Sequence, residues 1–127
     1  MNQPEFLDTE WYEATFKQLQ RLPARDFLYL DIRLVKWLAQ DSRLRFILNN
    51  DKDILDGLRE SVKKNGIQKP VVIKTDSYSH VSLYDGHHRL IVAEQLGLRK
   101  VPVLFETCEL LRIESKPVSE LIRWFME

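Results

Sequence analysis

The chain has 127 residues, 44% of them hydrophobic, and its 19 Lys and Arg residues balance its 19 Asp and Glu residues, so the formal net charge is zero. This length and composition predict one globular domain and exclude a disordered chain. The zero net charge excludes a broadly basic nucleic-acid-binding protein, although a local basic site stays open. The single cysteine, Cys108, excludes an internal disulfide and a multi-cysteine zinc site, and we expect an inert, buried thiol.

The sequence shows no signal for export or membrane insertion. Its first ten residues, MNQPEFLDTE, are acidic and lack the apolar segment of a secretory signal. No apolar run approaches the about 20 residues that a membrane-spanning helix needs. We therefore expect a cytoplasmic protein that makes no membrane contact.

The first half of the chain predicts a helix, a short strand and an ambiguous segment. The helix covers residues 9–20, where Thr9 can cap the first turn and Pro23 follows the end. Residues 27–31, FLYLD, are typical of a strand. Residues 32–40 have apolar side chains at helical spacing, but further apolar residues blur the buried face. The tryptophans are expected to be core or interface anchors: Trp11, Trp37 and Trp124.

The second half predicts alternating helices and strands. Residues 52–65 form an amphipathic helix, which ends at Gly66 because glycine tolerates the left-handed conformation. Two strands of a hairpin, a helix, a third strand and a final amphipathic helix follow: 71–74, 81–84, 87–96, 101–105 and 117–126. This order predicts an α/β (α+β) fold, a small mixed β-sheet with packed helices. The apolar stripe of the last helix either packs on the sheet or pairs with a second copy, which leaves a homodimer open.

The segment Asp85-Gly86-His87-His88-Arg89 joins a predicted strand to a predicted helix and carries the clearest chemistry. The first N–H groups of a helix have no internal partner and bind oxyanions such as phosphate. Gly86 would let an anion approach the backbone, and Arg89 can grip its oxygens. His87 and His88 can donate hydrogen bonds or transfer protons. Asp85 can hold Mg²⁺ or orient a histidine.

The stretch from residue 53 to 105 resembles the ParB/sulfiredoxin-like superfamily. Five pieces match the family in order and spacing: Leu58–Val62, Gly66–Ile73, Asp85–Arg89, Ala93–Gly97 and Val101–Val103. Upstream, Arg43-Leu44-Arg45 falls where ParB-like domains carry a basic box. The resemblance implies one domain over residues 1–127. It would contain a motif core at 53–105, a helical extension at 1–50 and a C-terminal helix at 117–126.

The resemblance also implies a nucleotide site. Carried over residue by residue, the base and sugar would meet Gly66, Gln68, Lys69 and Pro70. The phosphates would meet Gly86, His87, His88 and Arg89. The catalytic group would comprise Asp85, His87 and His88, with Asp85 as the ligand of Mg²⁺.

The variant Asp-Gly-His-His-Arg is similar to the free serine kinase branch of this superfamily, which favours phosphoryl transfer. Such transfer needs a second carboxylate as base, and Asp51 and Asp53 are the candidates, although each can instead cap a helix. Sulfiredoxin has its reactive cysteine where this chain has His87, so we expect no sulfinic acid reduction. The helix-turn-helix region that follows this module in ParB proteins is not seen in the sequence.

Three functions follow. The first is a nucleoside triphosphate hydrolase or small phosphotransferase that uses ATP, ADP or CTP with Mg²⁺. The second is a non-catalytic regulatory or DNA-associated module, such as a phage or plasmid ParB-like protein. The mildly basic region 17–69 supports it weakly, with twelve basic residues against seven acidic ones. A nuclease ranks last, because no compact carboxylate cluster for two metals is visible.

Overall fold

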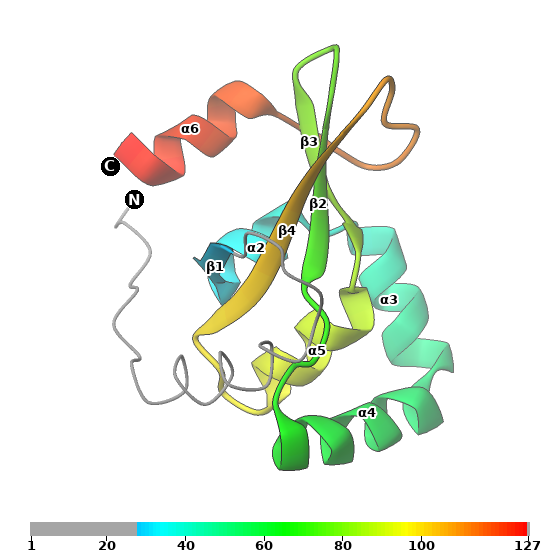
Figure 1. The fold of residues 1–127 in the computed structure, drawn as a ribbon. Coiled ribbons are helices and arrows are strands. Elements are labelled where there is room, and N and C mark those ends of the chain that lie inside the picture. The colour runs from blue at the N-terminus through cyan, green and yellow to red at the C-terminus, as the bar shows by residue number, and fades with distance from the viewer. Residues whose placement is uncertain (1–27, 127) are drawn as a thin grey trace.

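The computed structural model describes residues 28–126 and has a mixed α+β fold, as predicted (Figure 1). The predicted helix at 9–20 and Trp11 lie outside the described residues. In chain order the elements are β1 (Leu28–Asp31), α2 (Ile32–Leu38), α3 (Asp41–Asn50), α4 (Lys52–Asn65), β2 (Val71–Asp76), β3 (His80–Asp85), α5 (His87–Gln95), β4 (Lys100–Cys108), β5 (Lys116–Pro117) and α6 (Val118–Met126).

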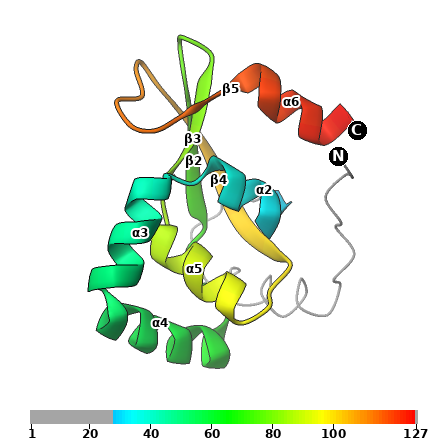
Figure 2. The same cartoon turned by 180° about the vertical axis from the view of Figure 1, so that it is seen from behind.

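The strands form one sheet in the order β1-β4-β2-β3-β5. Strands β2 and β4 are parallel, and the other pairs are antiparallel, so the sheet is mixed, as predicted. The chain crosses from β2 to β4 through the hairpin strand β3 and the helix α5. Helix α5 contacts the strand β2 and the helices α2, α3 and α4, so it lies at the centre of this group of helices (Figure 2).

The core lies between the sheet and the helices α2 and α5. Alternate residues are buried at the start of β2, whereas β1, β3 and β4 each have a run of three or four buried residues. Each fully buried Leu, Ile or Val side chain contributes about 1.5–3 kcal/mol to folding. The largest such side chains are Leu30, Leu34, Leu38, Ile47, Ile67, Ile73, Leu83, Leu90, Val35, Val71 and Val81.

Helix α3 was not predicted, and a distant residue explains why. The backbone N–H groups of Asp41 and Ser42 donate to the Glu114 carboxylate at 2.8 and 3.2 Å, and the Ser42 hydroxyl donates to it as well. These bonds satisfy first-turn donors that a local cap would usually satisfy. Only Ile47 of this helix is buried. The residue before the helix, Gln40, makes no side-chain cap bond, so the start of α3 depends on a contact distant in the sequence.

The ambiguous segment 32–40 resolves into helix α2, which Asp31 caps by accepting from the N–H of Arg33 at 2.8 Å. Strand β4 extends three residues beyond its predicted end, and β5 was not predicted. Cys108, at the end of β4, is partly exposed, so the expectation of a buried thiol is wrong.

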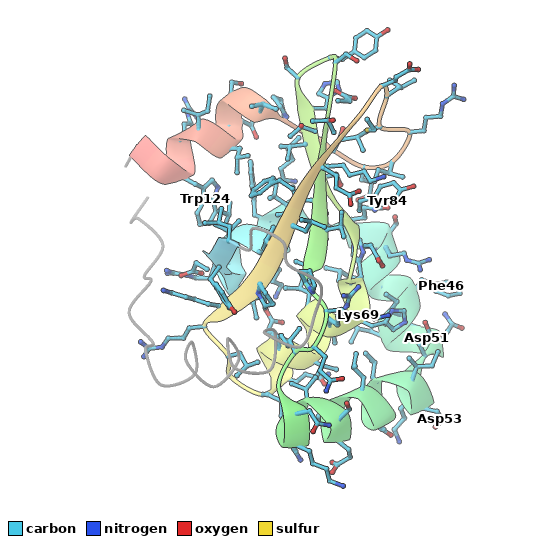
Figure 3. All side chains as sticks on the ribbon, in the orientation of Figure 1. Phe46, Asp51, Asp53, Lys69, Tyr84 and Trp124 are labelled. Carbon is cyan, nitrogen blue, oxygen red and sulfur yellow. The ribbon has the colours of Figure 1, made fainter. Side chains whose placement is uncertain are left out.

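Helix α6 packs within the chain. Leu121 is buried in the core, and the Trp124 ring lies 5.9 Å from that of Trp37 at an interplanar angle of 43°. Figure 3 shows Trp124 pointing from α6 toward the rest of the domain. Of the two alternatives for this apolar stripe, the described contacts are those of packing within one chain, and Trp37 and Trp124 are packing anchors, as predicted. Between residues 28 and 126, no helix has both the length and the apolar character needed to cross a membrane.

Candidate functional site

A cavity of about 470 Å³ lies between α4, the loop 66–70 and the first turn of α5. This α4–α5 cavity brings together five of the predicted site residues, from two segments about 20 residues apart in the sequence. Its lining comprises Ile54, Leu58, Ser61, Val62, Gly66, Ile67, Gln68, Lys69, His88 and Arg89. Figure 3 shows Lys69 near the start of α5, and Asp51 at the corner between α3 and α4.

The loop 66–70 is held from both ends. Gly66 has φ +70° and ends α4, donating its N–H to Val62 O at 2.8 Å. At the other end, Arg89 Nη1 donates to Lys69 O at 3.1 Å and to Pro70 O at 2.7 Å. The structure thus places the predicted base-side residues beside the predicted phosphate-side residues.

Arg89 holds the loop 66–70 in place and also puts a positive charge at the cavity. Its side chain is only 17% exposed, and its Nη2 lies 3.4 Å from Asp85 Oδ2. Burial lowers the pKa of the Arg89 guanidinium, and the charge of Asp85 opposes this effect. An arginine keeps its charge at physiological pH in either case. The bonds to the loop carbonyl groups and the pair with Asp85 hold the charge of Arg89 in a fixed position at the cavity.

Gly86 is required by packing. It has φ +106° as the residue before α5, and a Cβ there would lie 2.6 Å from Cγ1 of Val71. This contact is far closer than real Cβ contacts, and the left-handed backbone disfavours other residues. The start of β2 therefore gives Gly86 a role that does not depend on an approaching anion.

His87 lies inside the protein. The residue is only 3% exposed. Nε2 of its ring accepts a hydrogen bond from the backbone N–H of Gln40 at 3.0 Å. Burial lowers the pKa of His87 to about 4, and the charge of Arg43 acts in the same direction. The ring is therefore neutral at pH 7 and joins α5 to the link between α2 and α3. This position does not fit its predicted roles in phosphate binding and proton transfer.

His88 is the histidine at the cavity. Its Nε2 lies 2.9 Å from Oδ2 of Asp51, and the two side chains are 27% and 22% exposed. Successive helical residues point about 100° apart, which explains why His87 and His88 face different surroundings. Of the two carboxylates considered as bases, Asp51 reaches this histidine, whereas Asp53 is exposed and does not line the cavity.

Asp85 presents an open carboxylate at the end of β3. Its side chain is 68% exposed, and its described partner is Arg89. Within residues 28–126, no three His, Cys, Asp or Glu side chains gather closely enough to hold a metal ion. A metal at Asp85 would therefore need ligands from a bound molecule or from water. Mg²⁺ is commonly held in this way, by one or two carboxylates and substrate phosphates.

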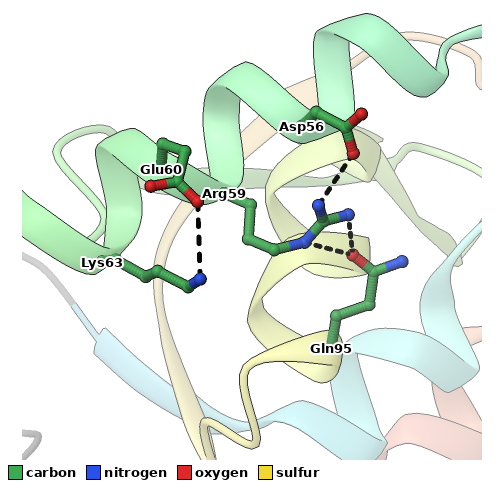
Figure 4. A network of polar contacts seen from close by, with 5 residues as sticks. All are labelled: Asp56, Arg59, Glu60, Lys63 and Gln95. Carbon is green, nitrogen blue, oxygen red and sulfur yellow. Dashed lines mark hydrogen bonds and ion pairs between the residues drawn. The ribbon is translucent and has the colours of Figure 1, made fainter.

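A polar network joins α4 to the C-terminal end of α5 (Figure 4). Arg59 donates from Nε and Nη2 to Gln95 Oε1 at 3.0 and 2.6 Å, and from Nη1 to Asp56 Oδ1 at 2.8 Å. Glu60 and Lys63 form an exposed pair on the same helix at 3.4 Å. The bridge from Arg59 to Gln95 spans 36 residues of sequence, and no local pattern predicts it.

The apolar wall of the cavity was also missed as part of a site. Ile54 belongs to the apolar face predicted for 52–65, yet it is 57% exposed and lines the cavity beside Leu58. The helical periodicity alone predicts that both side chains face the core. The structure instead leaves Ile54, near the start of α4, exposed to solvent.

Comparison with solved structures defines the fold class. Sulfiredoxin from Arabidopsis thaliana has a similar fold, with a TM-score of 0.52 and 17% sequence identity, covering 81% of this chain and 99% of that chain. The mixed sheet and its helices thus have a sulfiredoxin-like fold. A family model described as the ParB N-terminal domain matches residues 32–115, which is more than half of the chain. The chain therefore belongs to the ParB N-terminal domain family. A search of curated proteins finds no match.

Proposed function

We propose that this domain binds a nucleoside phosphate in the α4–α5 cavity, with the phosphates at the start of α5 and the base against α4. The observation that carries this proposal is the meeting of two unlike walls. Ile54 and Leu58 present apolar surface, whereas His88 and Arg89 bring cationic or hydrogen-bonding groups. A nucleotide has the same division into a flat base and anionic phosphates. The volume of about 470 Å³ lies within the about 300–1,000 Å³ of small-molecule sites.

The start of α5 supports the placement of the phosphates. Gly86 precedes this nine-residue helix, and no side chain caps it. The first-turn N–H groups and the positive end of the helix dipole therefore favour an anion there. Lys69 is exposed at the rim and adds a mobile cation. Arg89 supplies a fixed charge from beneath the loop.

The opposite wall supports the placement of the base. The exposed Ile54 side chain offers apolar surface that a base can cover, and each Å² of apolar surface removed from water contributes roughly 25 cal/mol. Ser61 and Gln68 are the polar side chains of this wall. Both can donate and accept hydrogen bonds, which suits the polar edges of a base or the hydroxyl groups of a sugar.

The proposed activity is hydrolysis of the nucleotide or transfer of a phosphoryl group. ATP, ADP and CTP are the nucleotides proposed. Mg²⁺ bound by Asp85 and phosphate oxygens would neutralise charge on the phosphates. The exposed position of the Asp85 carboxylate beside the start of α5 fits this role. The chain's own groups would bind and position the phosphates, and positioning supplies most of the catalysis in phosphoryl transfer.

A second candidate is a regulatory or DNA-associated module that uses the cavity without turnover. Arg43 and Arg45 on α3 are exposed and lie within the region matched by the ParB N-terminal domain model. Cationic side chains on an exposed helix suit contacts with DNA phosphates. Binding to duplex DNA that weakens steeply with salt would support this candidate, and no binding at low salt would argue against it.

Calorimetric titration with ATP, ADP, CTP and GTP, each with Mg²⁺, tests the proposal. Lys69→Ala is expected to weaken binding about fivefold, because an exposed ion pair contributes up to about 1 kcal/mol. Lys64→Ala removes the same charge from an exposed position on α4 outside the cavity, and we expect unchanged affinity.

Equal losses in the two variants, or no binding by the wild type, would refute the phosphate site. Release of phosphate from the nucleotides that bind then separates the two candidates. Turnover supports the enzyme, and binding without turnover supports the regulatory module.

A further inference from the structure

Asp51 is the single residue that joins α3 to α4. Its N–H donates to Ile47 O at 2.9 Å at the end of α3, and its carbonyl accepts from Leu55 N at 3.0 Å at the start of α4. Aspartate at the start of a helix usually accepts first-turn N–H groups with its side chain. Here the Asp51 carboxylate makes no such bond. It contacts His88 instead, 37 residues later in the sequence.

This contact determines which ring nitrogen of His88 carries the hydrogen. An ionised carboxylate can only accept hydrogen bonds, so Nε2 of His88 must carry the hydrogen. The other ring nitrogen, Nδ1, has no partner among the residues that the structure describes. His88 lines the α4–α5 cavity, whereas Asp51 does not. Asp51 therefore acts on the cavity through the histidine.

We propose that Asp51 is a positioning residue for the nucleotide site, holding His88 so that Nδ1, when it is protonated, donates to a phosphate oxygen. The inference rests on the proposed function and deepens it. A carboxylate on one ring nitrogen fixes the orientation of the imidazole and stabilises the imidazolium that forms when the ring donates from both nitrogens. The phosphate would thus meet a cation whose counter-charge lies on the far side of the ring.

The direction in which one substitution changes the nucleotide affinity distinguishes this role from a simple effect of charge. Removing a negative charge close to an anion site should strengthen anion binding, if charge alone matters. If Asp51 orients His88 toward the phosphate, its removal should weaken binding. The other charged groups around the ring and the cavity, namely Asp85, Arg89 and Lys69, are unchanged by the substitution.

The experiment compares Asp51→Asn with Asp53→Asn by calorimetric titration with ATP and with CTP, each with Mg²⁺. Asparagine at position 51 can still contact His88 but has no charge. We expect a loss of affinity of about tenfold, equivalent to about 1.4 kcal/mol. Asp53→Asn removes the same charge two residues away, from a side chain outside the cavity, and should leave binding unchanged or slightly tighter. Unchanged or tighter binding by Asp51→Asn, or an equal loss in both variants, would overturn the proposal.

A measurement without nucleotide separates this inference from the proposed function. The ¹⁵N chemical shifts of the His88 ring, recorded well above the ordinary histidine pKa of about 6.5, show which nitrogen carries the hydrogen. We expect hydrogen on Nε2 in the wild type and a mixture of the two forms in Asp51→Asn. A mixture in the wild type would overturn the positioning role, whether or not nucleotide binds. If no nucleotide binds while the wild-type ring is held as expected, the proposed function fails and the link between Asp51 and His88 stands.

Discussion

The two sides of the first turn of α5 have different surroundings, although neighbouring residues of one short segment form them. On the inner side, Gly86 packs against Val71 and His87 is buried on Gln40. On the outer side, His88 and Arg89 line the cavity. The same residue type, histidine, thus stabilises the fold at one position and faces a candidate ligand site at the next. The comparison teaches that the Asp-Gly-His-His-Arg segment serves two purposes, which mutation can separate.

The largest expected effect is on the inner side. Gly86→Ala should destabilise the domain by about 3 kcal/mol or more, because its Cβ would clash with Val71 and its backbone is left-handed. Gly57→Ala is the matched control, since a Cβ there meets nothing within 4 Å. The control should stabilise α4 by about 0.5–1 kcal/mol. Urea unfolding measures both, and similar stabilities for the two variants would contradict the packing role.

The second largest expected effect is a loss of folding stability at acidic pH, which comes from the buried His87. The folded pKa of His87 is about 4, below the ordinary 6.5, so the unfolded chain binds the proton more readily. Stability is therefore full above pH 6.5 and falls by about 3 kcal/mol as the pH drops from about 6.5 to 4.

His87→Gln does not titrate in this window and should flatten the pH dependence of the free energy of unfolding between these values. The carboxylates whose pKa values are lowered, Asp76 chiefly by its backbone hydrogen bond from Leu111 and Glu114 chiefly by its bond from Ser42, start to lose their contributions near their ordinary pKa values of 3.8 and 4.5, at the acid end of this window. The difference between the wild type and the variant therefore isolates the contribution of His87. An unchanged slope in the variant would show that another group controls it.

The smallest effect on stability should come from the outer side. His88→Ala removes a half-buried side chain with one polar partner, and we expect a change in the free energy of unfolding of about 1 kcal/mol or less. His87→Ala, one residue earlier, should cost about 2–3 kcal/mol because it leaves the Gln40 N–H unpaired and empties a buried volume. Equal costs at the two positions would break the distinction between the two sides.

Much of the fold follows from local patterns. The helix at 52–65 and the start of α5 were predicted from periodicity and glycine signals, and the β2–β3 hairpin from its β-branched runs. Helix α3 could not be predicted, because its first-turn donors bond to Glu114. His87 is buried and His88 lines the cavity because only one side of α5 faces the core. The sequence alone does not show which side that is.

The contact between Glu114 and the start of α3 has a consequence for how the chain is made. Residues 41 and 42 leave the ribosome long before residue 114, so α3 forms its first turn without its capping carboxylate during most of synthesis. Glu114 also brings its carbonyl to the buried Ser82 hydroxyl. Both bonds become available only when nearly the whole domain has emerged. The final structure is therefore reached late in translation, through a contact of long sequence separation that local helix formation cannot replace.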